Sequence, residues 1–259
     1  MTATSTAAGR LSALGRAELT LLARNRTAVF IALLMPLLMI FAIKSSLDRI
    51  DLGGTGLSVA GAALTGGIGM VLLQVVYLNL VSAYVARREE LVLKRLRTGE
   101  VSDPEILTGT ALPAVLLALV QCVLIVVIGT LAFGLGAPGR PDLLVAGLLV
   151  GSVLLSALAA ATATLTRTVQ TSQLTTLPLF FVSMLGSGVF IPLDVFPDRV
   201  ASVCELLPLT GVMTLVRAGW LGGGGGGGGD LIGAAVTALA WTVFAVFAVK
   251  RWFRWDPRR

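Results

Sequence analysis

Apolar residues run in six long segments along the chain, and polar residues gather between them. A helix needs roughly 20 residues to cross a bilayer, and these segments have about that length or more. No Asp, Glu, Lys or Arg lies centrally in any of them. The segments are Thr27–Ile43, Leu57–Tyr84, Ile106–Leu135, Leu143–Leu165, Gln173–Ile191 and Leu231–Val249. The pattern predicts an all-α integral membrane protein with six transmembrane helices in one domain that covers residues 1–259.

Composition supports a membrane environment. The chain is 56% hydrophobic and 13% charged, whereas soluble domains carry about 25% charge. Histidine, the commonest general base and metal ligand, is missing from the sequence. We therefore expect no catalytic site and no metal site in this chain. We also expect no bound cofactor and no nucleic-acid partner.

Basic residues determine the expected orientation. Most of the 20 lie in the N-terminal lead, in the loop between the second and third segments, and at the C-terminus. The positive-inside rule then places both termini in the cytoplasm. Residues 1–26 carry Leu11, Leu14, Leu21 and Leu22 at helical spacing, which predicts an amphipathic helix on the inner leaflet. A partly disordered arm is the alternative for this lead.

The loop Arg87–Glu105 holds ten charged residues, out of 20 basic and 14 acidic residues in the whole chain. Arg87–Arg97 reads as a short helix that Thr98 and Gly99 end. Ser102 and Glu105 then form a capping box that opens the third span. Anchoring would need basic residues alone, so the mixed charges favour docking to a soluble partner. A solvated loop with self-paired charges is the alternative.

Glycine marks two further features. Residues 222–229 are all glycine and predict a slack outer linker, since polyglycine holds no fixed conformation without help. Gly147 and Gly151 form a GxxxG pattern, which indicates that another helix packs closely on the fourth span.

Two motifs resemble a known family. The stretch "EELVLKRLRTGEVSDPEILTG" is similar to the cytoplasmic coupling helix of type-2 ABC exporter permeases, the group that includes daunorubicin-resistance-type membrane subunits. The stretch "SGVFIPLDVFPDRVASVCELLPLTGVMTLVR", residues Ser187–Arg217, resembles the exit of the fifth span and the half-helix of that family. The motifs occur in the right order with the right number of spans, so the resemblance covers nearly the whole chain.

The resemblance implies a single transmembrane permease domain that dimerises, as a homodimer, and binds two copies of a cytosolic ABC ATPase. That ATPase would bind the ATP and Mg²⁺, because this chain has no GxxxxGK[ST] motif. The coupling loop 87–105 would dock through Arg87, Arg88, Glu89, Glu90, Leu93, Lys94, Arg95, Leu96 and Arg97. The segment 192–220 would re-enter the outer leaflet as broken helices, with an outer gate at Phe190, Pro192, Phe196 and Pro197.

Polar residues recur at helical steps on two spans and indicate a candidate translocation path. On the second span they share a face with Met70, and on the fifth they form a row of hydroxyls. The set is Met70, Gln74, Tyr77, Thr176, Ser183 and Ser187. Interhelical hydrogen bonding is the alternative role for these residues.

An apolar path with scattered hydroxyls suits a hydrophobic or amphiphilic cargo, such as a drug, an antibiotic or a lipid-like molecule. We expect export across a bacterial plasma membrane. An ion-coupled carrier and a non-transporting scaffold are the competing classes, and the carrier is disfavoured because the spans lack ionisable residues.

Overall fold

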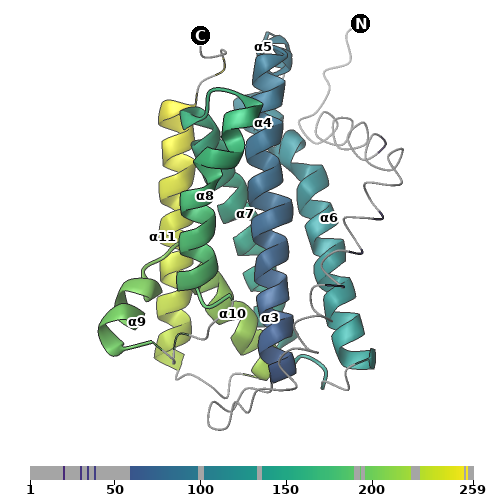
Figure 1. Cartoon of the computed structure of the whole chain (residues 1–259), viewed down its shortest axis with the longest axis vertical. Helices are drawn as coiled ribbons and strands as arrows, with labels where there is room; N and C mark the ends of the chain where they lie inside the picture. Colours follow the sequence, from purple (N-terminus) through teal and green to yellow (C-terminus); the bar gives the residue numbers. More distant parts are fainter. Residues whose placement is uncertain are drawn as a thin grey trace, which may run out of the picture.

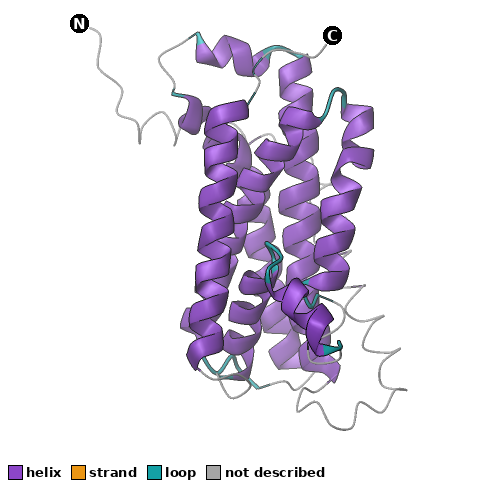
Figure 2. Cartoon of the chain, turned by 90° about the vertical axis from the view of Figure 1, so that its left-hand side faces the viewer, coloured by secondary structure: helices purple, strands orange, loops and turns teal. Residues whose placement is uncertain are grey.

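A computed structural model shows the chain as a bundle of long helices standing side by side (Figure 1). The structure describes residues 59–98, 102–132, 136–189, 193, 196–222, 228–253 and 255, together with four isolated positions between 20 and 38. Within these ranges the regular structure is entirely helical, and Figure 2 draws no strand among them. The predicted all-α class is confirmed for this part of the chain.

The helices follow one another with short connections. They are α3 (Val59–Val71), the π-helical segment η1 (Leu72–Leu78), α4 (Asn79–Glu89), α5 (Val92–Arg97), α6 (Asp103–Ala132), α7 (Pro141–Leu165), α8 (Val169–Gly186), α9 (Asp198–Glu205), α10 (Thr210–Leu221) and α11 (Gly228–Trp252). Segments α3, η1 and α4 join end to end into one continuous helix.

Four of the described helices are long and apolar enough to cross a membrane. They coincide with the second, third, fourth and sixth predicted spans and cover Gly61–Glu89, Asp103–Leu131, Pro141–Leu165 and Leu231–Trp252. A fifth crossing results if α9 and α10, which meet at 99°, count as one broken span. The protein is therefore a multi-pass membrane protein.

The remaining predicted spans differ from these four. The fifth folds as α8, whose 18 residues extend about 27 Å at 1.5 Å per residue. It is thus slightly shorter than the hydrocarbon core, and several Ser, Thr and Gln residues dilute its apolar content. Apart from the four isolated positions, the first predicted span and the N-terminal interfacial helix lie outside the described residues, as does most of the glycine linker.

The Gly61–Glu89 helix lies at the centre of the bundle. Of its most apolar stretch, 72% is buried, against 28% for Asp103–Leu131 and 22% for Leu231–Trp252. Burial of a span inside a membrane protein reflects contact with other helices, since the outer helices face lipid instead of water. The second predicted span therefore forms the core. Helix α11 exposes many of its large apolar side chains, and α6 exposes fewer, among them Val123 and Val127.

The two ends of the bundle carry different elements. Helix α5 and the C-terminal end of α11 lie at one end, and α9 and α10 lie towards the other (Figure 1). The Arg97 guanidinium carbon lies 5.0 Å from the centre of the Trp255 ring, so the charged loop and the C-terminal segment meet. This arrangement agrees with a loop and a C-terminus on the same side of the membrane.

Glycine permits very close packing around α10. A Cβ at Gly151 of α7 would lie 2.7 Å from Val212, and a Cβ at Gly219 of α10 would lie 2.4 Å from the Leu144 backbone nitrogen. On the other side of α10, a Cβ at Gly211 would lie 2.2 Å from the Ala234 carbonyl oxygen of α11. The close helix packing predicted from the GxxxG pattern is confirmed, and the partner helix is α10.

Candidate functional site

The charged stretch folds as two helical pieces instead of the single predicted helix. Helix α4 continues through Arg87 and Arg88 to Glu89, and α5 begins at Val92. Between them Leu91 has φ of 60°, the one positive φ among the described residues other than glycine. A left-handed residue ends a helix, because its backbone turns the chain out of the right-handed path. The prediction of one continuous helix over Arg87–Arg97 was therefore wrong, because the helix is interrupted at Leu91.

Hydrogen bonds define this break. The Glu90 backbone N–H donates to the Ala86 carbonyl at 2.9 Å, and the Leu91 N–H donates to the Arg88 carbonyl at 3.1 Å, which closes the last turn of α4. The Arg95 N–H then donates to the Leu91 carbonyl at 3.0 Å and begins the next helix. Leu91 is thus the corner from which α5 departs.

Arg88 is turned into the bundle. Its side chain is 1% exposed, and its guanidinium donates to the Ala163 carbonyl at 2.8 Å and to the Thr166 carbonyl. These carbonyls lie at the C-terminal end of α7, where the helix dipole favours a positive charge. The side chain is accordingly bonded within the chain and lies away from the surface that a partner would contact.

The remaining predicted docking residues divide into two sets. Leu93 is fully buried, Leu96 and Arg87 are partly buried, and the Arg87 guanidinium donates to Thr110 Oγ1 of α6 at 3.0 Å. Helix α5 packs on α4 and α6 through this side. The other set is exposed and consists of Glu89, Glu90, Lys94, Arg95 and Arg97. Together with Leu91, which is also exposed but was not predicted to dock, these residues form what we call the charged face.

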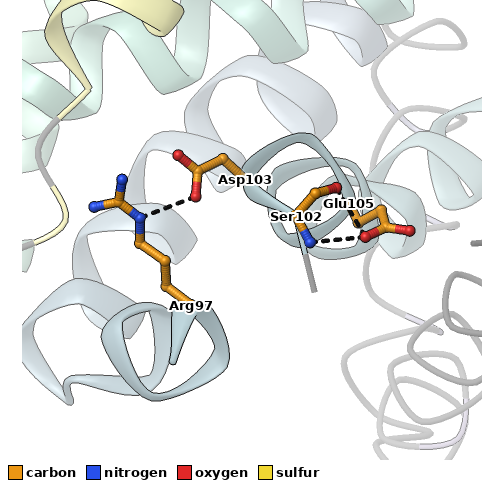
Figure 3. A network of polar contacts seen from close by, with 4 residues as sticks. All are labelled: Arg97, Ser102, Asp103 and Glu105. Atoms are coloured by element: carbon orange, nitrogen blue, oxygen red, sulfur yellow. Dashed lines mark hydrogen bonds and ion pairs between the residues drawn. The ribbon is translucent and has the colours of Figure 1, made fainter. Parts of the chain in front are cut away.

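The end of α5 is fastened to the start of α6 (Figure 3). Arg97 Nε donates to Asp103 Oδ1 at 3.0 Å, with both side chains about half exposed. The Ser102 backbone N–H and hydroxyl both donate to Glu105 Oε2, at 2.7 Å and 2.8 Å. The Glu105 half of the predicted capping box is confirmed. The Ser102 hydroxyl, however, donates to Glu105 where a full capping box would have it accept a backbone N–H. Gly99 and Glu100 lie outside the described residues.

The candidate path residues of the second span do not share one face. Met70 and Tyr77 are buried, and the Tyr77 hydroxyl lies 3.2 Å from Thr162 Oγ1 of α7, whereas Gln74 is exposed. The π-helical segment η1 explains the difference, since i to i+5 bonding gives a wider turn and shifts the register by part of a turn. Gln74 therefore joins Asn79, five residues on, as an exposed polar position.

On the fifth span the predicted row of hydroxyls forms as expected but faces inward. Thr176, Ser183 and Ser187 are all buried. One turn towards the N-terminal end of the same row, Ser172 Oγ lies 3.0 Å from Ser82 Oγ of α4. These contacts favour the interhelical role for the buried set, and they leave the opposite, largely apolar face of α8 exposed.

The predicted outer gate is described only in part. Phe190 and Pro192 lie outside the described residues, while Phe196 is partly buried and Pro197 precedes α9. The predicted broken helices do occur in this segment, as α9 and α10.

Arg217 of α10 fastens the segment that follows α8. Its guanidinium donates to the Gly188 carbonyl. This contact escaped the sequence interpretation. A lone arginine in an apolar segment was the available signal for it, whereas nothing in the sequence distinguishes the left-handed Leu91.

Comparison with known proteins identifies the family. The family model described as ABC-2 type transporter matches residues 10–221, which include the charged face, the central helix and α10. No match is found among curated proteins. The family match covers most of the chain, and it implies association with an ABC ATPase and with the membrane. The chain therefore belongs to the ABC-2 type transporter family, as a membrane subunit of an ABC transporter.

Proposed function

We propose that this chain is the membrane subunit of an ATP-driven exporter and that its charged face docks into a separate cytosolic ABC ATPase. The observation that carries the proposal is the division of the loop into an anchored side and an exposed side. Leu93 and Arg87 hold the loop on α4 and α6, while Glu89, Glu90, Lys94 and Arg95 point outward with both signs of charge. Charges of both signs held in fixed positions orient a partner through ion pairs.

The contacts around α5 provide a route for mechanical coupling. Arg97 connects α5 to Asp103 of α6 and to Trp255 beyond α11. Arg88, three residues before the Leu91 corner, connects α4 to the end of α7. A displacement of α5 would thus be shared by four helices, as expected of the element that receives ATPase closure.

The complete transporter in this proposal has twelve spans. Two copies of this chain, each with six spans and cytoplasmic termini, form a homodimer in a bacterial plasma membrane. Two ATPase copies bind the ATP and Mg²⁺, because the sequence has no GxxxxGK[ST] loop.

The cargo path in this proposal runs between the two copies. The exposed polar positions Gln74 and Asn79 lie on the helix that packs beside α8, whose exposed face carries Leu177 and Phe181. Such a wall, apolar with a few amide groups, suits a hydrophobic or amphiphilic drug, antibiotic or lipid-like molecule. The buried residues Tyr77 and Ser183 then support the wall from behind.

Charge reversal tests the docking. The full chain would be purified with its cognate ATPase after Lys94→Glu and Arg95→Glu, and ATPase capture would be compared with the wild type. A control variant, Arg199→Glu, reverses an exposed basic residue on α9 at the other end of the bundle. We expect capture to fall at least tenfold for the α5 variant alone. Equal capture by both variants would refute docking through the charged face.

A further inference from the structure

A cavity opens between α6, α7 and α11 at the α5 end of the bundle. Its volume is about 610 Å³, within the range of small-molecule sites. The walls are mainly apolar and include Ala111 and Val115 of α6, Val153 and Ala157 of α7, and Val246 of α11. The cavity borders the charged face at Arg97, and its lining does not include the exposed polar positions Gln74 and Asn79.

The charged groups of the cavity gather at one end. Arg97, Asp103, Lys250 and Trp255 all line it there. Arg97 bonds Asp103 through Nε alone, so its two terminal nitrogens remain available as donors. Lys250 makes no ion pair within the described ranges. Two cations and one carboxylate leave this end with a net positive charge.

The cavity also runs along the helices from this end into the bundle. On α6 its lining extends from Asp103 to Val115, which is about 18 Å at 1.5 Å per residue. That distance corresponds to roughly one leaflet of the hydrocarbon core. The aromatic ring of Trp255 at the charged end is typical of the membrane–water interface.

One buried hydroxyl beside the cavity has no hydrogen-bond partner among the described residues. Ser156 Oγ is buried and makes no hydrogen bond among the described residues, and Ser156 lines the cavity one turn further in than Ala160. A buried hydroxyl ordinarily finds a partner. Rotation of the Ser156 side chain would let this hydroxyl donate to an ester oxygen of an occupant that lies below a charged headgroup.

We propose that this cavity binds one anionic phospholipid, with the phosphate at Lys250 and Arg97 and an acyl chain along α6 and α7. The charge, the length and the apolar wall each match that molecule. A zwitterionic lipid would place a cation beside Lys250, and a wholly apolar cargo would leave both basic groups unused. The lipid would sit against Arg97, next to the charged face, so the phospholipid composition would bias the position of α5.

The test measures the phospholipid that the full-length protein retains. The protein is reconstituted in nanodiscs of phosphatidylcholine and phosphatidylglycerol and then extracted in mild detergent, and both lipids are quantified by mass spectrometry. We expect phosphatidylglycerol to be enriched over its share of the nanodisc. Lys250→Gln should lower the retained phosphatidylglycerol about fivefold, the effect of one basic group near anionic lipid.

Two controls separate the cavity from the general surface. Arg251→Gln removes the neighbouring exposed charge, which does not line the cavity, and should leave retention unchanged. Ala157→Phe fills the apolar part and should abolish the enrichment, whereas Val236→Phe on the exposed side of α11 should not.

Three results would overturn the proposal. The first is equal retention of the two lipids, and the second is an equal effect of the Lys250 and Arg251 variants. The third is unchanged phosphatidylglycerol retention after Ala157→Phe, which is expected if cargo or another part of the chain fills the cavity. Because Lys250 is exposed, its variant should fold even if Ala157→Phe does not. No ATPase is present in the measurement, so lipid binding can fail while docking stands, and docking can fail while lipid binding stands.

Discussion

Arg88 gives the sharpest prediction, because it was expected to contact a partner and is found bonded inside the chain. Replacing it by methionine keeps much of its length and removes the guanidinium. Two carbonyls at the end of α7, those of Ala163 and Thr166, then lose their donor. Arg95→Met, on the exposed charged face, is the matched control.

The magnitude follows from these contacts. A hydrogen bond from a charged donor contributes about 1.5–3 kcal/mol, and a cation at a partly buried helix C-terminus contributes up to about 2 kcal/mol. The methionine offsets part of the loss by packing. We expect Arg88→Met to lower the free energy of unfolding by about 3–5 kcal/mol, which is the loss of two such hydrogen bonds and the helix-end charge less the gain from methionine packing. Arg88→Lys should recover part of it, since an ammonium keeps the charge without the planar fork.

The assay is unfolding of the purified chain in mixed micelles with increasing dodecyl sulfate, followed by tryptophan fluorescence. A second measurement, ATPase capture per folded protein, distinguishes a structural from a docking role. We expect capture to be unchanged for Arg88→Met and reduced for Arg95→Met. If the two variants unfold at the same detergent fraction, the structural role assigned to Arg88 is wrong.

Three further predictions use the same unfolding measurement. Gly219→Leu should destabilise the protein by more than about 2 kcal/mol, because a Cβ there would meet the backbone of α7 and overpacking costs about 1–3 kcal/mol or more. Gly233→Leu, whose Cβ would meet open space, should be near neutral. Equal effects of the two variants would contradict the packing. Leu91→Asn should stabilise by about 1 kcal/mol, since asparagine tolerates the left-handed region at lower cost, and a loss of stability would speak against strain at this corner. Tyr77→Phe should cost about 0.6–1.5 kcal/mol through loss of the Thr162 contact, and this cost should vanish in a background that already carries Thr162→Val.

The sequence predicted those features that depend on composition or on a short local pattern. Four spans coincide with described helices because lipid demands long apolar segments there. Glu105 caps the start of α6 because the partner N–H belongs to Ser102, only three residues away. The close packing on α7 followed from Gly147 and Gly151, since two missing side chains on one face leave room for another helix.

The features that could not be predicted depend on tertiary context. The π-helical segment around Gln74 has no local sequence signal, so a regular helical wheel placed the exposed Gln74 on the same face as the buried Met70 and Tyr77. Leu91 adopts a left-handed conformation that its own side chain disfavours, and the anchoring of Leu93 and Arg87 on neighbouring helices holds it there. Arg88 looked equivalent to the adjacent Arg87 until the position of the end of α7 was known.

The glycine contacts of α10 limit how the end of the bundle opposite α5 can change shape. At Gly219 and Gly211 the backbones of α7, α10 and α11 meet without intervening side chains, so no layer of rotamers is available to absorb sliding. These three helices must therefore move together as one rigid body. Any opening at that end then has to occur at the edges of this rigid body, where α10 contacts its other neighbours. The hinges of such an opening must lie outside Thr210–Leu221.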